Sequence, residues 1–185
     1  LTVNGRISAA NQLSLTGTAT TAGAAVTGLE IGPTAVLTAG AIGLTATGSA
    51  TAALTATGVI GTSVQGSITS AGPIAISGTV SVPGATSVTG VSLSGGAVSA
   101  TGTATITITG SGVPAPAPAT SFDVSLLGTT VSSGGGEIKL VGDRMNVASG
   151  INSGTGRTMF VPSTVASRPI TRLGASETAA MNLSQ

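Results

Sequence analysis

The chain has 185 residues, of which 41% are hydrophobic, 1% aromatic and 6% charged, whereas an ordinary soluble domain is about a quarter charged. Its formal net charge of +1 gives no field that would steer nucleic acid or an anionic membrane surface. The absence of cysteine excludes disulfides and thiolate metal sites. Residues 31–122 contain no charged side chain, so this stretch lacks general acids, bases and metal ligands, which argues against an enzyme.

A short motif recurs along the first 110 residues, in which large apolar side chains alternate with Ser, Thr or Ala and a Gly follows. Its copies lie at residues 13–17, 37–40, 44–48, 54–58, 74–78, 91–95 and 106–110. The period of two predicts strands with one buried and one solvated face. We expect each closing Gly to form a turn, because Gly adopts positive φ at little cost. Helix is disfavoured by the β-branched residues and the interior Gly.

Many short strands leave three architectures open, namely a sandwich, a closed barrel and a β-solenoid. Two Phe and three Met, without Trp or Tyr, cannot fill the thick core of a sandwich or barrel. The Lys and Glu that normally protect sheet edges are also missing from most of the chain. We therefore predict an all-β, parallel β-helix (β-solenoid) with a thin aliphatic core. Coils of about 20 to 25 residues would give about eight coils and a rod about 40 Å long.

The predicted organisation is one continuous domain in three parts. Residues 1–110 form coils that are uncharged apart from Arg6 and Glu30, and residues 121–185 form further coils that carry most of the charges. Between them, the Pro- and Ala-rich residues 111–120 cannot join a ladder and are predicted to form a corner loop, with an interdomain linker as the alternative. Residues 134–136 and 153–156 are predicted turns. No run of 18 apolar residues occurs, so we expect no transmembrane segment.

Three stretches resemble filamentous-haemagglutinin-like adhesins, which are large bacterial proteins secreted by the two-partner route. Residues 1–9 read Leu-Thr-Val-Asn-Gly-Arg-Ile-Ser-Ala, and residues 142–152 read Gly-Asp-Arg-Met-Asn-Val-Ala-Ser-Gly-Ile-Asn. Residues 154–184 resemble a segment that recurs late in their β-helical arrays. The resemblance implies a right-handed β-helix, an extracellular or cell-surface location, and a role in adhesion, biofilm or extracellular matrix. It supplies no catalytic residues.

The chain begins in the middle of this pattern, with neither Met nor a signal peptide. We therefore expect a processed product or a fragment of a larger protein.

We assign no catalytic, cofactor-binding or metal-binding residue, and we expect no enzyme activity. The five carboxylates are Glu30, Asp123, Glu137, Asp143 and Glu177. No His accompanies them as a base, and no aromatic platform is present for a sugar. Asp143 and Arg144 are predicted to be a neutralised surface pair. No calcium-binding repeat or EF-hand occurs, and Gly134-Gly-Gly lacks the Lys-Ser/Thr of a phosphate loop.

The Arg-bearing last third supports an alternative function, a receptor- or glycan-binding tip that uses the loop at residues 112–119. Its arginines are Arg144, Arg157, Arg168 and Arg172. Acidic residues lie near them and no aromatic residues interleave, so scattered solvated Arg is expected and nucleic acid is not an expected partner. The sequence Asn182-Leu183-Ser184 matches a glycosylation acceptor, which we attribute to chance.

Pairs of Thr separated by one residue are the one repeated surface chemistry. They are Thr18/Thr20, Thr45/Thr47, Thr55/Thr57, Thr103/Thr105 and Thr107/Thr109. In a strand both hydroxyls of a pair point the same way, so stacked pairs could bind ice. Thr is also a favourable residue on any pleated surface, and the irregular spacing of the pairs argues against a flat lattice. Ice binding is therefore a lesser alternative.

The function that we expect is structural. The chain would form a secreted or cell-surface fibre segment, because uncapped coils expose unpaired backbone groups and should stack into a homo-oligomer or filament. Host, cell-surface or matrix components are the other expected partners.

Overall fold

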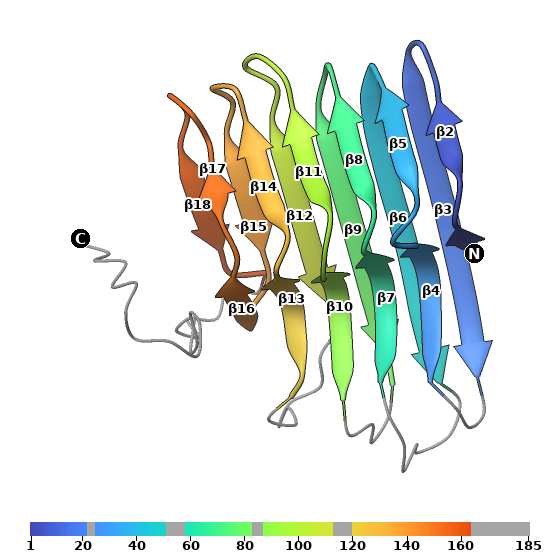
Figure 1. The fold of residues 1–185 in the computed structure, drawn as a ribbon. Coiled ribbons are helices and arrows are strands. Elements are labelled where there is room, and N and C mark those ends of the chain that lie inside the picture. The colour runs from blue at the N-terminus through green and yellow to red at the C-terminus, as the bar shows by residue number, and fades with distance from the viewer. Residues whose placement is uncertain (22–24, 51–57, 83–86, 113–119, 164–185) are drawn as a thin grey trace.

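A computed structural model describes residues 1–21, 25–50, 58–82, 87–112 and 120–163. Within these residues the chain forms three parallel six-stranded sheets and no helix. It visits the three sheets in turn, so that each strand from β1 to β15 pairs with the strand three places later, and six coils result (Figure 1). In Figure 1 the chain rises through the first two strands of a coil on the near side, descends through the third behind them and advances away from the N-terminus. The protein is therefore a right-handed parallel β-solenoid, as predicted.

The three sheets are named A, B and C in the order in which each coil reaches them. Sheet A contains β1 (Thr2–Val3), β4 (Val26–Ile31), β7 (Val59–Val64), β10 (Val88–Leu93), β13 (Phe122–Leu127) and β16 (Met145–Ala148). Sheet B contains β2 (Arg6–Ser8), β5 (Val36–Ala39), β8 (Ser67–Ser70), β11 (Ala97–Ala100), β14 (Thr130–Ser133) and β17 (Ile151–Asn152). Sheet C contains β3 (Gln12–Thr21), β6 (Ala41–Ala50), β9 (Ile74–Ser81), β12 (Ile106–Ser111), β15 (Ile138–Val141) and β18 (Thr158–Val161).

The coils are longer than the sequence predicted, and the described residues form six of them. Paired residues of neighbouring coils are 28 residues apart at Thr2 and Glu30 and 33 apart at Ser99 and Ser132. Only the last two described coils are closer in sequence. Glu137 and Arg157, which lie on these neighbouring coils, are 20 residues apart. The estimate of 20 to 25 residues was too short because a sheet C strand spans the width of both other sheets. Six coils at about 4.8 Å per strand spacing give an axial length of about 25 to 30 Å rather than 40 Å.

Ladders of identical or similar aliphatic side chains fill the main core. Along sheet C, for example, Ile42, Ile74, Ile106 and Ile138 pair in sequence across four coils, and each is at most 2% exposed. Sheet B contributes Leu37, Ile68, Val98 and Val131, all fully buried. Burial of each such side chain contributes about 1.5 to 3 kcal/mol. The core is thin because these ladders face one another directly, which confirms the expected aliphatic interior.

Close contact between the backbones of sheets A and C divides the interior. We call this contact the glycine seam, which is formed by Gly28, Gly61 and Gly90 of sheet A and by Gly17, Gly78 and Gly110 of sheet C. A Cβ atom at any of these positions would lie closer than 3.0 Å to backbone atoms, a separation that real Cβ atoms do not show. The main core lies on one side of the seam. On the other side lies a small second core of Ala50, Val59, Val80, Val82 and Val88.

The seam corrects the expectation that each motif ends in a turn. Gly17, Gly48, Gly78 and Gly110 lie inside β3, β6, β9 and β12. These strands continue through the Gly because its missing side chain lets sheet A approach, whereas a turn would need a change of direction. By contrast, Gly58 and Gly95 have φ of 70° and 142° and do lie outside strands. The alternation of buried and solvated residues also breaks at the seam, where both Gly28 and Leu29 of β4 are buried.

The predicted turns at residues 134–136 and 153–156 are confirmed, because both lie at the corner between sheets B and C. In the second turn the Gly156 N–H donates to the Ser153 carbonyl at 2.9 Å. The Pro-rich segment joins β12 of sheet C to β13 of sheet A, and its residues 113–119 lie outside the described residues. The parallel ladders continue past it, since β10 pairs with β13.

Adding one methyl group at the seam should destabilise the fold. In Gly78→Ala the new Cβ would overlap the Gly90 carbonyl oxygen, and neither backbone can move without disturbing its ladder. We expect the free energy of unfolding, measured by urea denaturation, to fall by about 1 to 3 kcal/mol.

Gly43→Ala is the matched control, because Gly43 lies on the outer face of β6 and its Cβ would meet only the Ser14 hydroxyl, at 4.0 Å. This change should leave stability within about 1 kcal/mol, or raise it slightly. Equal losses in the two variants would contradict the seam.

Candidate functional surfaces

The outer face of sheet C carries hydroxyl groups in two parallel columns, which we call the hydroxyl array. The first column is Thr16, Thr45, Ser77 and Thr109, and the second is Thr18, Thr47, Thr79 and Ser111. Each column runs along the solenoid axis through four coils, one residue per coil. The two columns lie two residues apart on each strand, and a shorter third column of Thr20, Ser49 and Ser81 follows in three coils.

The hydroxyls of the array face solvent. Thr16, Thr18, Thr45 and Thr79 are exposed, and the other members are partly exposed. Thr79 and Ser111 share a hydrogen bond of 3.2 Å. The remaining hydroxyls of the two columns make no hydrogen bond within the described part of the chain, so they are available to water or a ligand.

The array includes only some of the predicted Thr pairs. Thr18/Thr20, Thr45/Thr47 and Thr107/Thr109 lie on this face, whereas Thr103/Thr105 precede β12 and Thr55/Thr57 lie outside the described residues. The irregular spacing in sequence, which argued against a flat lattice, does not put these residues out of register between coils. Thr20 and Ser49 are 29 residues apart and Thr79 and Ser111 are 32 apart, yet both pairs are in register. Segments between the strands absorb the difference in length.

The hydroxyl array ends at the fifth coil, where sheet C carries a charged residue. In the fifth coil Lys139 pairs with Thr107, and Val141 occupies the first column beside Thr109. Among the described residues of sheet C, Lys139 is the one charged side chain. The outer face of sheet B has a single polar column, which is Ser8, Thr38, Thr69, Ser99, Ser132 and Asn152. Val36 and Ala97 interrupt the positions beside this column.

Asp123 is the one carboxylate inside the described part of the solenoid, where it is 3% exposed. It follows Gly90 in the sheet A ladder, in the row of the glycine seam. Its Oδ2 accepts the backbone N–H groups of Asp143 and Arg144, at 2.8 and 3.0 Å. The strand of the next coil, β16, begins only at Met145, so strand pairing with that coil starts at Val124, and the Asp123 N–H donates to the Arg144 carbonyl just before it. The carboxylate therefore closes the seam where the coils become shorter, which is a structural role that the sequence analysis did not assign.

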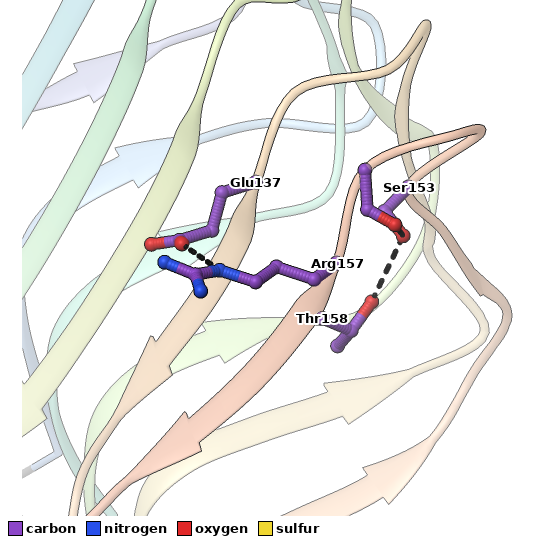
Figure 2. A network of polar contacts seen from close by, with 5 residues as sticks. Glu137, Ser153, Arg157 and Thr158 are labelled. Atoms are coloured by element: carbon purple, nitrogen blue, oxygen red, sulfur yellow. Dashed lines mark hydrogen bonds and ion pairs between the residues drawn. The ribbon is translucent and has the colours of Figure 1, made fainter.

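The other charged groups lie apart from one another, and some of them contact neighbouring side chains. Arg157 donates from Nε to Glu137 Oε2 at 2.6 Å between neighbouring coils, and the Arg157 side chain remains 74% exposed (Figure 2). Beside them, Thr158 donates to the Ser153 hydroxyl at 3.4 Å (Figure 2). The Arg144 guanidinium lies 5.9 Å from the centre of the Phe122 ring. Such contacts are typical of a solvent-exposed surface on which a charged side chain is balanced by a neighbour.

Asp143 was predicted to form a surface pair with Arg144. Its carboxylate accepts the Ser163 N–H at 2.9 Å. Glu30 lies far from these groups, on β4, where its Oε2 accepts the Thr2 hydroxyl at 3.4 Å. No cluster of three or more Asp, Glu, His or Cys that could hold a metal occurs in the described ranges. The same ranges contain no helix long and apolar enough to cross a membrane.

Several predicted site residues lie outside the described residues. They are most of the loop at 112–119, together with Arg168, Arg172, Glu177 and Asn182-Leu183-Ser184.

The two end coils present half-buried apolar side chains and strand edges. Val3, Ile7, Leu13 and Leu15 form the interior layer of the first coil, and Val147, Ile151 and Phe160 form that of the last described coil. These residues are less buried than their partners in the middle coils, because a neighbouring coil covers only one side of them. In the described residues, the strands of both coils pair on one side only.

No protein family, curated protein or solved structure matches this chain.

Removing the Asp123 carboxylate should cost more stability than removing the exposed ion pair. Asp123→Ala leaves two partly buried N–H groups without their acceptor, so unfolding free energy should fall by about 1 to 3 kcal/mol. Arg157→Ala should change it by at most about 0.5 kcal/mol, because that pair is solvated.

Asp123→Asn keeps one acceptor oxygen and should lose less than Asp123→Ala. Urea denaturation of the three variants would measure this order. A larger loss in Arg157→Ala than in Asp123→Ala would contradict the role given to Asp123.

Proposed function

We propose that this chain is a structural segment of a secreted or cell-surface bacterial fibre of the filamentous-haemagglutinin-like kind. The observation that carries the proposal is the continuous parallel ladder, in which three sheets run along one axis through all six coils. A body of this kind transmits tension along its axis through backbone hydrogen bonds. The small number of charged groups on the walls and the dispersed carboxylates support a mechanical or adhesive role over a chemical one.

The end coils support self-association along the axis. An isolated block of six coils is about 25 to 30 Å long, which is no longer than a ten-residue strand of sheet C, at about 33 Å. A fibre therefore needs further coils stacked on this block. The partners would be other copies of the chain, or continuing coils of a longer protein. Adhesion to host, cell-surface or matrix components would then use the side walls of the fibre.

The backbone of β2 provides a specific edge for such stacking. The Ala9 N–H donates to the Thr38 carbonyl at 2.9 Å, and the Gly5 carbonyl accepts the Val36 N–H at 3.3 Å. Because alternate residues of a parallel strand bond to the same neighbour, Ser8 directs its N–H away from β5, toward the side where a further coil would lie. An edge of this kind is a template for another strand.

Blocking this edge should stop axial assembly. Ser8→Pro removes the outward N–H and places a ring at the edge, while the bonds to β5 remain. We expect negative-stain electron microscopy to show rods longer than a single six-coil block for the unaltered chain and single blocks for Ser8→Pro. Circular dichroism of the variant should retain the strand signal.

Ser8→Ala is the control, since it keeps the N–H and should assemble like the unaltered chain. Dispersed particles of the unaltered chain at every concentration tested would contradict self-association. Loss of assembly in Ser8→Ala as well would show that the backbone edge is not the contact.

A further inference from the structure

We propose that the outer face of sheet C is an ice-binding surface, with ordered water as the ligand of the hydroxyl array. This inference goes beyond the fibre role and needs no assembly of the chain. It rests on three properties of the array: its two-dimensional period, its free hydroxyls and its lack of charge.

The period of the array is fixed by the backbone. Members of one column are separated by the strand spacing of about 4.8 Å, and the two columns by about 6.6 Å along each strand. Both distances are of the order of the repeat distances in a crystal of water. Ladders of like side chains, such as Ile42, Ile74 and Ile106 behind this face, are a feature that stabilises sheets with little twist. In Figure 1 the sheet C strands β3, β6, β9 and β12 run side by side with little change of direction.

The side chains hold their hydroxyls in place. Six of the eight positions are Thr, whose branched Cβ restricts χ1 and so limits the orientations of each hydroxyl and methyl group. Behind them, the inward residues of the same strands are locked in the core, as Leu44 and Ile76 are. Each free hydroxyl can both donate to and accept from water. A preorganised array loses little entropy on binding a surface that is itself ordered.

The chemistry of the face disfavours charged ligands and ligands that stack on aromatic rings. In the first four coils β3, β6, β9 and β12 contain no charged residue, so the face has no charge-assisted bond to offer an anion, a cation or a charged peptide. It also contains no aromatic ring on which a sugar could stack, since Phe160 belongs to the core side of β18 and Phe122 to sheet A. A neutral, periodic, hydrogen-bonding partner remains, and ice has these properties.

The other walls lack the same pattern. Sheet B has one polar column flanked by Val36 and Ala97, and the outer face of sheet A includes Glu30 and the aromatic Phe122. This contrast provides a control position. Thr38 of sheet B and Thr47 of sheet C belong to the same coil, are both partly exposed and both have hydroxyl residues on either side in their columns.

The test compares Thr47→Lys with Thr38→Lys in the full chain. Purified protein is held in a film of polycrystalline ice just below the melting point, and the concentration that halts crystal coarsening is measured. We expect the unaltered chain and Thr38→Lys to halt coarsening at the same concentration. Thr47→Lys should need about tenfold more, because one long charged side chain holds ice away from the centre of the array.

Circular dichroism establishes that each variant is folded, and Thr79→Lys, at an exposed position of the same column, serves as a second disrupting variant. The proposal is overturned if the unaltered chain has no more effect than an equal concentration of a globular protein without ice affinity. It is also overturned if Thr38→Lys loses as much activity as the sheet C variants, because the array would then not be the site.

Discussion

The parallel backbone ladder between successive coils is the interaction on which the rest of this structure depends. It sets the spacing of the coils, aligns like side chains above one another and leaves each wall as a two-dimensional lattice. The aliphatic ladders through Ile74 and Ile106 seal the interior, yet they can be thin because the backbone supplies the order. The same ladder explains how a chain with 6% charged residues and two Phe forms a regular body.

The glycine seam is the second constraint, and it determines the cross-section. Where Gly61 and Gly78 meet, sheets A and C touch through their backbones, so a main core and a smaller second core form on either side. Among the described residues the second core extends as far as Val88, and Asp123 takes the position that Gly90 holds one coil earlier. Its carboxylate satisfies two backbone N–H groups at the corner that replaces the lost strand pairing. The buried Asp123 carboxylate therefore stabilises the backbone at the point where the coils become shorter.

Much of the fold could be predicted from the alternation of apolar and hydroxyl residues, but the register could not. The pattern in residues 74–78 predicts a strand whatever its neighbours are, whereas the coil length depends on segments between strands that vary freely. Gly78 was interpreted as a turn because the sequence does not show which backbone approaches it. A clearer signal was present: residues 13–20, 42–49, 74–81 and 106–111 align when their leading pairs of Leu or Ile are superposed. That alignment places Thr16, Thr45, Ser77 and Thr109 in one column.

The register of sheet C tests the account most directly, and the absence of Cys allows it to be measured by cross-linking. Thr45 and Ser77 are paired across neighbouring coils, so their Cα atoms lie about 4.8 Å apart, within the range of a disulfide. Thr45 and Thr79 are offset by two residues and lie about 8 Å apart, outside that range. We expect the double variant Thr45→Cys/Ser77→Cys to oxidise to an intramolecular disulfide and Thr45→Cys/Thr79→Cys to remain reduced. Preferential bridging of the second pair would contradict the in-register parallel stack.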